Sequence, residues 1–389
     1  MLSNNIIYKN FRLKKKYSKE KKIIKTLKNL IKFPSQILVS MSTNYKDSYK
    51  KKLITKYKKF NNFRVIGMGG SIFGAKAIFN FLKPKIKNFE FIDNLVDNNI
   101  KKKNSKKNIN LIISKSGNTL ETITNSNILI NEKNINIFLT ENKKSYLTNL
   151  AYKLKSDVVH HNNFIGGRYS VLSEVGMLPA ELMGLKAQKF RQLNNLIKNK
   201  YFFNSLVNNV SSIYNLFIEN KTNSIILNYD QQSCDIFNWY QQLVAESLGK
   251  DGKGILPIVS LMPQDNHSVM QYYLDGIRNN FFTFFFVREK NSIKINKNNL
   301  LNSFLYLENK TTNKILYSQF LATEKIFSKK KIPFRSFVVN NRNEKTLGEL
   351  FIFFILETIL LGDLIKVNPY NQPAVELIKN QTKNILISK

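Results

Sequence analysis

The 389-residue chain has one cysteine, Cys234, so it can form neither an internal disulfide framework nor a zinc site built from several cysteines. A lone thiol is typical of a protein in a reducing compartment, and we expect a cytoplasmic location. Histidine is almost as scarce. There are three in the chain, and His160 and His161 are adjacent in a predicted loop. So few ligands do not assemble into a recognisable metal site, and we expect no bound metal.

The chain also lacks an apolar run of membrane length. Its most apolar window, ELFIFFILETILLGDLI at 349–365, is shorter than a normal span and carries Glu349, Glu357 and Asp363. This window predicts a buried helix, and we expect no membrane association. The basic N-terminus lacks the continuous apolar core of a targeting segment.

Acidic residues are few: 26 Asp and Glu face 61 Lys and Arg, for a formal net charge of +35. Nucleic-acid binding is one interpretation of such an excess. However, most of the charge is lysine spread from end to end, together with abundant asparagine and isoleucine, which indicates a bias of the whole genome. We therefore expect no nucleic-acid partner. The charge would still raise the encounter rate with an anionic substrate.

Hydrophobic residues make up 43% of the chain, enough for a core in two or three domains. The short apolar runs FRVIG, INLII and INIFLT predict buried strands, and a segment with helical spacing follows each of them. A second set begins at NSIILNY and continues with FFTFFFV and FRSFVV. Strands that alternate with helices predict an α/β fold with parallel sheets. The boundary between the two sets is expected near residues 186–222.

Two further helices are expected. The run KKIIKTLKNLIKF near the N-terminus places Ile23, Leu27 and Leu30 at helical spacing, and we prefer a helix docked on a later domain to one lying on a membrane surface. The segment SVLSEVGMLPAELMGL at 170–185 predicts one helix with Pro179 inside it.

The first predicted strand ends in a glycine loop, VIGMGGSIFG. Gly67 and Gly69 match a dinucleotide fingerprint, but Ile72 stands where its third glycine is required, which argues against a nicotinamide cofactor. Bare backbone amides and Ser71 suit an anion or a sugar hydroxyl. A tight turn with Ser71 as helix cap explains the same residues equally well.

The next predicted strand ends in SKSGNT, in which Ser114, Lys115, Ser116 and Thr119 gather at the start of a helix. Helix N-termini and hydroxyls bind phosphate, and this spacing is not that of a nucleotide-triphosphate loop. The sequence therefore favours a phosphate monoester over an exposed polar turn, because two such loops follow neighbouring strands.

Two charged residues stand in settings that suit catalysis. Arg168 follows Gly166 and Gly167 and could stabilise an oxyanion, and Glu246 ends an otherwise apolar helix and could act as a base. Each residue taken alone also has a purely structural explanation. Arg168 could be a surface arginine after a turn, and Glu246 could be a solvated glutamate at a helix end. His267 could shuttle a proton or simply cap a helix. In the last segment, Gln372 precedes Lys379 by seven residues, in a chain where most lysines are solvated.

Taken in order, these motifs resemble the phosphoglucose isomerase (glucose-6-phosphate isomerase) family over residues 65–379. Any one motif is weak, whereas six in order with sensible gaps are specific. The matching segments are GGS at 69–71, SKSGNTLET at 114–122, GGRYS at 166–170, ESLGK at 246–250, QDNHS at 264–268 and NQPAVELIK at 371–379.

The resemblance implies two sugar-isomerase domains of SIS type, each a parallel sheet flanked by helices, with N-terminal helices and a C-terminal helical segment. It implies four regions: an N-terminal helical segment at 1–60, a first sugar-isomerase domain at 61–190, a second at 191–366, and a closing segment at 367–389. It also implies a homodimer with the active site at the subunit interface, a hexose 6-phosphate substrate, and no cofactor.

The resemblance further implies roles by position. Glu246 would be the base that moves a proton between C1 and C2, and Arg168 would stabilise the cis-enediolate. His267, which the partner subunit supplies in this family, would help to open the sugar ring, with Lys379 nearby. The residues expected to bind substrate are Gly70, Ser71, Ser114, Lys115, Ser116, Thr119, Gln242 and Gln372.

The sequence departs from the family pattern at Asn371, where aspartate is usual, and at Ala374, where glycine is usual. The expected activity is the interconversion of glucose 6-phosphate and fructose 6-phosphate. The alternatives are a bifunctional glucose/mannose-6-phosphate isomerase and a non-catalytic sugar-phosphate sensor. A sensor would not need Glu246, Arg168 and His267 together.

Overall fold

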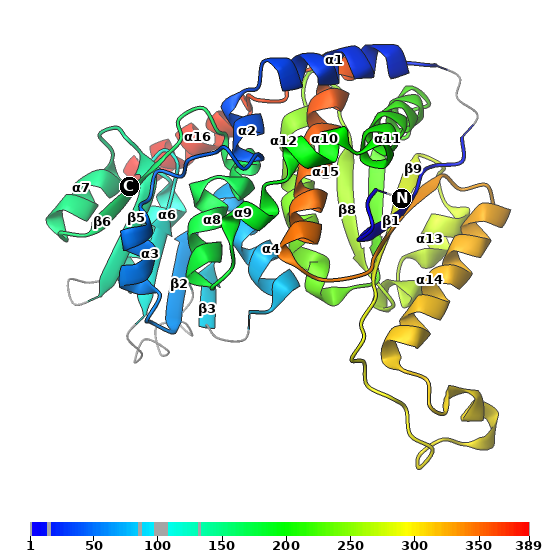
Figure 1. Ribbon diagram of the computed structural model, residues 1–389. Helices are drawn as coiled ribbons and strands as arrows, with labels where there is room; N and C mark the ends of the chain where they lie inside the picture. Colours follow the sequence, from blue (N-terminus) through cyan, green and yellow to red (C-terminus); the bar gives the residue numbers. More distant parts are fainter. Residues whose placement is uncertain (1, 14–16, 85–87, 97–107, 131–133, 389) are drawn as a thin grey trace.

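A computed structural model describes residues 2–13, 17–84, 88–96, 108–130 and 134–388, and it contains two five-stranded sheets side by side (Figure 1). The first sheet is parallel throughout, in the order β3-β2-β4-β5-β6. Its central strand β4 is buried over its whole length, as expected of an apolar run covered on both faces. The strands are β2 (Asn62–Gly67), β3 (Asn88–Ile92), β4 (Ile109–Ile113), β5 (Ile135–Glu141) and β6 (Asp157–His161).

The second sheet has the order β1-β10-β9-β7-β8, and four of its strands repeat the order of the first sheet. The fifth, β1, pairs antiparallel with β10 and places Ile6 opposite Val339. The sequence predicted only helices before residue 60, so this strand corrects that expectation; four residues among lysines and asparagines are too few to show a strand period. The strands are β1 (Ile6–Lys9), β7 (Asn223–Asn228), β8 (Leu256–Leu261), β9 (Asn280–Val287) and β10 (Phe334–Val339).

The helix predicted at 170–185 is interrupted. A 3-10 helix, η2, ends at Leu172, Ser173 is extended with φ −91° and ψ −173°, and a separate α8 follows. Pro179 lies inside α8 without ending it. The helices on this side are α2 (Gln36–Ser40), α3 (Lys51–Tyr57), η1 (Gly69–Ser71), α4 (Phe73–Leu82), α6 (Leu120–Leu129), α7 (Tyr146–Lys153), η2 (Gly167–Leu172) and α8 (Glu174–Leu182).

The window 349–365 forms most of α15, which is buried along nearly its whole length, so the prediction of a buried helix is confirmed. No helix in the described part of the chain is long and apolar enough to cross a membrane. The remaining helices are α1 (Glu20–Lys32), α9 (Ala187–Phe190), α10 (Leu193–Lys198), α11 (Lys200–Ile218), η3 (Gln231–Ser233), α12 (Cys234–Leu248), η4 (Gln264–His267), α13 (Met270–Asp275), η5 (Asn302–Leu307), α14 (Thr312–Lys329), α15 (Glu344–Ile365) and α16 (Val375–Ile387).

The N-terminal helix α1 lies across α11 and α15 and buries Ile23 and Leu27 against the second half of the chain (Figure 1). The N-terminal helix is therefore docked on helices of the second half of the chain. The stretch 186–222, expected as a boundary, contains α9, α10 and α11, and α11 packs on α15.

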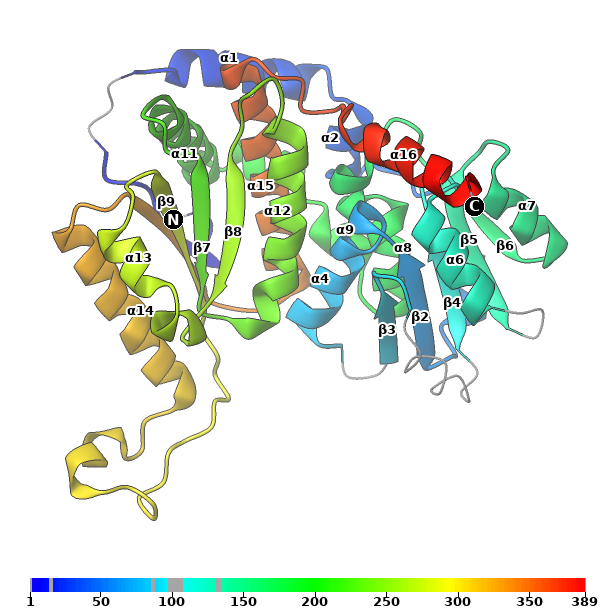
Figure 2. The same ribbon diagram turned by 180° about the vertical axis from the view of Figure 1, so that it is seen from behind.

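The two halves meet through α4 and α12. Helix α12 of the second half packs against α4 and also against η1 and η2, the two turns that follow strands of the first sheet (Figure 2). The carboxyl edge of the first sheet therefore faces the end of α12, and the functional residues gather at this junction.

Candidate active site

The hydroxyl-rich loop follows β4 at the place where the strand order of the first sheet reverses. In open parallel sheets, ligands bind in the crevice at such a point. Ser114 Oγ and Thr119 Oγ1 are 2.9 Å apart, and the amide of Asn118 donates to Ser116 Oγ at 3.2 Å. Gly117 has φ +66°, and a Cβ there would lie 2.1 Å from Ser145 Oγ, so glycine is required for this turn. Helix α6 begins directly after the turn, at Leu120.

Lys115 is fixed by two oxygens. Its Nζ donates to the Asn163 carbonyl at 2.9 Å and lies 3.4 Å from Glu141 Oε1. Burial would raise the pKa of Glu141, but Lys143 and Lys115 outweigh it and hold the pKa below its usual value. Lys115 also lines a surface depression of about 690 Å³ together with Tyr169 and Tyr370. The ammonium group is thus held at the edge of a space that can admit a small anion.

The two glycine loops touch through their backbones. A Cβ on Gly70 would lie 2.2 Å from the carbonyl carbon of Gly167, and one on Gly69 would lie 2.9 Å from Gln242 Nε2. Ser71 ends η1, half-buried, immediately before the helix α4. Side chains at these glycines would separate the loop after β2 from η2, and the site would open.

Arg168, at the start of η2, is buried and donates hydrogen bonds to two other segments of the chain, the end of α12 and residues 369–372. Its Nε donates to Ser247 Oγ at 2.8 Å, and Nη2 donates to the carbonyls of Pro369 and Asn371 at 2.7 and 3.1 Å. Its Nη1 donates to Glu246 Oε1 at 3.1 Å and to Gln372 Oε1. The guanidinium is therefore oriented before any ligand is bound.

Glu246 lies in the last turn of α12, with 19% of its side chain exposed. Gln242, one turn earlier, donates from Nε2 to Glu246 Oε2 at 2.9 Å. Its Oε1 is buried and has no hydrogen-bond partner among the described residues. Gln242 thus orients the carboxylate, and its free Oε1 could accept a hydrogen bond from a substrate hydroxyl.

Three residues that had no expected role complete this cluster. Tyr169 Oη bonds with Ser247 Oγ at 2.8 Å and donates to the Pro369 carbonyl at 3.0 Å. Lys250 Nζ donates to the carbonyls of Ser247 and Asn368. Burial, reinforced by the charge of Arg168, lowers the pKa of Lys250. All three belong to the motifs GGRYS and ESLGK, but only their contacts show that they fasten the closing segment over Arg168.

His267 and Lys379 are not brought to this cluster within one chain. Glu246 ends a helix that packs along β8, and His267 follows β8 in η4, so the two residues sit at opposite ends of a strand roughly 17 Å long. His267 is exposed. Lys379 lies on the exposed helix α16, where its Nζ pairs with Glu376 at 2.6 Å.

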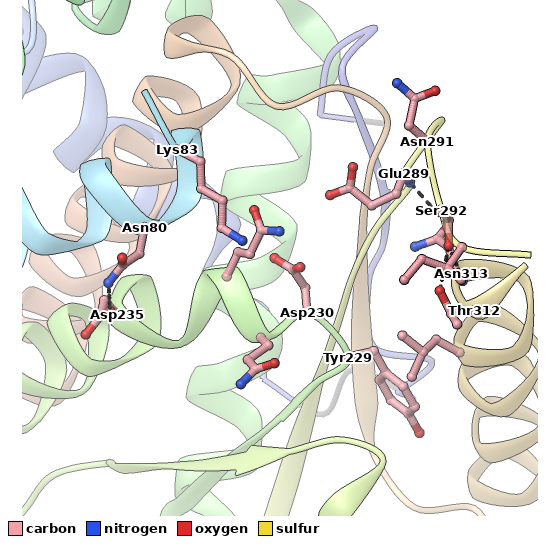
Figure 3. A pocket seen from close by; sticks show the side chains of 14 residues that line it. Asn80, Lys83, Tyr229, Asp230, Asp235, Glu289, Asn291, Ser292, Thr312 and Asn313 are labelled. Atoms are coloured by element: carbon pink, nitrogen blue, oxygen red, sulfur yellow. Dashed lines mark hydrogen bonds between the residues drawn. The ribbon is translucent and has the colours of Figure 1, made fainter. Parts of the chain in front are cut away.

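The second sheet has its own depression where its strand order reverses, of about 600 Å³ (Figure 3). Asp230, Asp235 and Glu289 contribute three carboxylates to the lining, against the single lysine Lys83. Arg342 donates to Asp230 and Glu289 at 2.5–3.0 Å, so much of this polarity is already paired. This depression suits a phosphate less well than the edge with Lys115.

The fold and this arrangement of loops define the class of the protein: two sugar-isomerase units of SIS type in series. A tagatose-6-phosphate ketose/aldose isomerase from Escherichia coli shares the fold at a TM-score of 0.51, with 12% identity over 90% of this chain and 93% of that one. Within this class the chain belongs to the phosphoglucose isomerase family, whose sequence model matches residues 47–254.

The relatives extend the match beyond that range. The chain is 32% identical to a glucose-6-phosphate isomerase of Methanocaldococcus jannaschii, over 83% of this chain and 84% of that protein. It is 33% identical to a glucose-6-phosphate isomerase of Mycoplasmopsis pulmonis, over 84% of this chain and 82% of that protein. Among solved structures, a hypothetical protein of Thermus thermophilus superposes with a TM-score of 0.83, at 22% identity and 94% coverage of both chains.

Proposed function

We propose that this protein interconverts glucose 6-phosphate and fructose 6-phosphate. One observation carries the proposal: in a member of the phosphoglucose isomerase family, Glu246 and Gln372 accept hydrogen bonds from the buried Arg168, and Gln242 donates to Glu246. A carboxylate beside a guanidinium fits a reaction in which a proton moves and an oxyanion forms next to it.

Glu246 takes the proton from C2 of the open-chain aldose, and the electron pair left behind forms the C1–C2 double bond of an enediolate. Returning the same proton to C1, while the hydroxyl proton moves from O2 to O1, yields the ketose, so no other reactant is consumed. Arg168 stabilises the negative charge on the substrate oxygens, which is greatest between these two steps. Gln242 and Gln372 contact the sugar hydroxyls in this scheme.

The 6-phosphate binds at the turn after β4. Ser114, Ser116 and Thr119 supply hydroxyls, Lys115 supplies a positive charge, and the N-terminus of α6 supplies backbone amides. Gly70 and Ser71 complete the wall from the loop after β2. Because this phosphate is remote from C1 and C2, its binding energy holds the reacting carbons against Glu246.

Ring opening requires a proton shuttle, and the sequence offers His267 for it. Since His267 sits at the far end of β8 from Glu246, a second copy of the chain would have to supply it, with Lys379 closing the same site. This need supports a homodimer with shared active sites. The division at residues 60, 190 and 366 is part of the same proposal, and its support is that α9 ends at Phe190 and α15 ends at Ile365.

The scheme needs no metal or organic cofactor. We place the protein in glycolysis and gluconeogenesis, and its lone cysteine supports a cytoplasmic location. The test is a coupled assay on purified protein with EDTA present, in which fructose 6-phosphate is supplied and an NADP-linked dehydrogenase detects glucose 6-phosphate. We expect full activity with EDTA. If the folded protein binds 6-phosphogluconate but does not convert fructose 6-phosphate, the chain is a sugar-phosphate sensor. Turnover of mannose 6-phosphate would define the bifunctional alternative.

A further inference from the structure

A buried glutamate that the proposed reaction does not use lies behind the phosphate loop. Glu174, the first residue of α8, has no exposed surface. Its Oε1 accepts the Asn162 amide at 2.5 Å and lies 3.1 Å from His161 Nδ1, and its Oε2 accepts the Tyr45 hydroxyl at 2.7 Å. A carboxylate with this many donors in the interior is an organising centre for the segments that supply them.

These donors keep the carboxylate charged. Burial alone would raise the pKa of Glu174, but hydrogen bonds from His161, Tyr45 and the Asn162 amide together lower it below its usual value. Because the charged carboxylate attracts these donors, it also holds them in their positions. Removing the charge frees them.

The main segment held in this way is the turn of residues 162–166, which joins β6 to η2. The Asn162 amide is bound to Glu174, and the Asn162 side chain and carbonyl accept the amides of Phe164 and Ile165 at 3.0 and 3.1 Å. Between them, the carbonyl of Asn163 accepts the hydrogen bond from Lys115 Nζ. The position of the lysine ammonium therefore depends on a turn that is anchored at Glu174.

The N-terminal segment supports the turn from the other side. Tyr45 stacks under Arg191 at 4.9 Å, and Arg191 forms a bidentate pair with Asp47 at 2.6 and 2.8 Å. Arg191 Nε also donates to the Leu172 carbonyl at 3.0 Å, just past the GGRYS motif. Tyr45 is thus held rigidly, and its hydroxyl reaches Glu174 from a fixed position.

We infer that Glu174 is a positioning residue for phosphate binding: through the turn 162–166 it sets the ammonium group of Lys115, which belongs to the turn proposed to bind the sugar phosphate. The inference rests on the proposed function. It also separates two effects, because Arg168 is fixed independently by Ser247 and the closing segment. Disturbing Glu174 should weaken substrate binding more than it slows the chemical step.

The test is Glu174→Gln, which keeps the size of the side chain and removes its charge. We expect KM for fructose 6-phosphate and Kd for 6-phosphogluconate to rise about tenfold, with kcat lowered less than threefold. A purely structural role would instead reduce the active fraction, which lowers kcat and leaves KM unchanged. That result would overturn the inference, as would wild-type kinetics.

The matched control is Glu349→Gln, the same change at a buried glutamate on α15 that bonds to Ser3, and it should keep wild-type KM. If Glu174→Gln does not fold, Tyr45→Phe decides, because it removes one donor without changing charge. A rise of about threefold in KM supports the inference, and an unchanged KM overturns it. Should the wild type bind 6-phosphogluconate without turnover, the proposed function fails, while the Kd comparison still tests Glu174.

Discussion

Arg168 Nη1 lies 3.1 Å from Glu246 Oε1, so the two charged groups of the proposed reaction are in contact before substrate arrives. Six further contacts, from Gln242, Ser247, Gln372, the carbonyls of 369 and 371, and the Tyr169 ring, hold this pair in place. Little reorganisation is then needed when charge develops on the substrate, which is the condition under which electrostatic stabilisation is most effective.

Glu246→Gln should abolish proton transfer while leaving the site intact. The amide keeps the shape of the side chain and can still accept from Arg168, but it cannot take the C2 proton. We expect kcat to fall by roughly a thousandfold and Kd for 6-phosphogluconate to change less than threefold. Steady-state kinetics and calorimetric titration measure the two values. Normal turnover in this variant would show that another residue is the base.

Lys115→Ala tests the phosphate loop. Removing the ammonium should raise Kd for 6-phosphogluconate at least about tenfold, because one charge-assisted contact to the phosphate is lost. Lys143→Ala is the matched control: Lys143 also pairs with Glu141, but it is not among the residues that line the depression with Lys115. Equal effects of the two substitutions would mean that overall positive charge, and not the loop, attracts the ligand.

Mixing inactive variants tests the shared site. If His267 serves the partner's Glu246, random pairing of Glu246→Gln with His267→Ala subunits gives heterodimers with one intact site and one doubly defective site. Activity of the mixture should then recover to about a quarter of the wild-type value, since half of the dimers carry one working site. No recovery after verified subunit exchange would place both residues in the same chain's site.

The raised pKa of Glu349 should make the free energy of unfolding depend on pH. Burial raises its pKa from 4.5 to about 7. Between those values the folded protein binds more protons than the unfolded chain, so the free energy of unfolding falls as pH rises and levels off above about pH 7. Glu349→Gln should remove this decline, with a difference between pH 5 and pH 8 on the order of 2 kcal/mol. Denaturant titrations at both pH values measure it, and parallel profiles would contradict the prediction.

The strands β2, β4, β5, β7, β9 and β10 could be predicted from sequence because they are continuous apolar runs buried on both faces. Besides β1, the predictions missed β3, β6 and β8. Pro257 lies inside β8, which argues against a strand there. The short edge strands β3 (NFEFI) and β6 (DVVHH) contain polar residues, so neither forms the continuous apolar run by which the other strands were predicted. The break at Ser173 also escaped prediction, because it depends on Gly176 packing where a Cβ would lie 2.0 Å from the Val171 carbonyl oxygen.

For the site, the motifs pointed to Arg168, Glu246 and Gln372, and the structure brings these three together. The sequence could not show that Tyr169 and Ser247 meet across 78 positions to hold Arg168. Nor could the sequence assign a positioning role to Glu174, since a glutamate that follows a serine at a helix start is common in the first turn of helices. Its three hydrogen bonds come from 12, 13 and 129 positions away.

The pairing of Ile6 with Val339 has a consequence for how the chain is made. Of the described strands, β1 leaves the ribosome first, and β10, the strand that it joins, leaves last. The strands of the first sheet lie within residues 62–161 and can pair long before β10 is made, whereas the second sheet is complete only when β10 has left the ribosome. Until then, β1 has no partner strand, and its open hydrogen-bonding groups can pair with any other strand. A fusion that holds β1 away from β10 would prolong that exposure, leave the outer edge of β10 open as well, and favour aggregation without touching the active site.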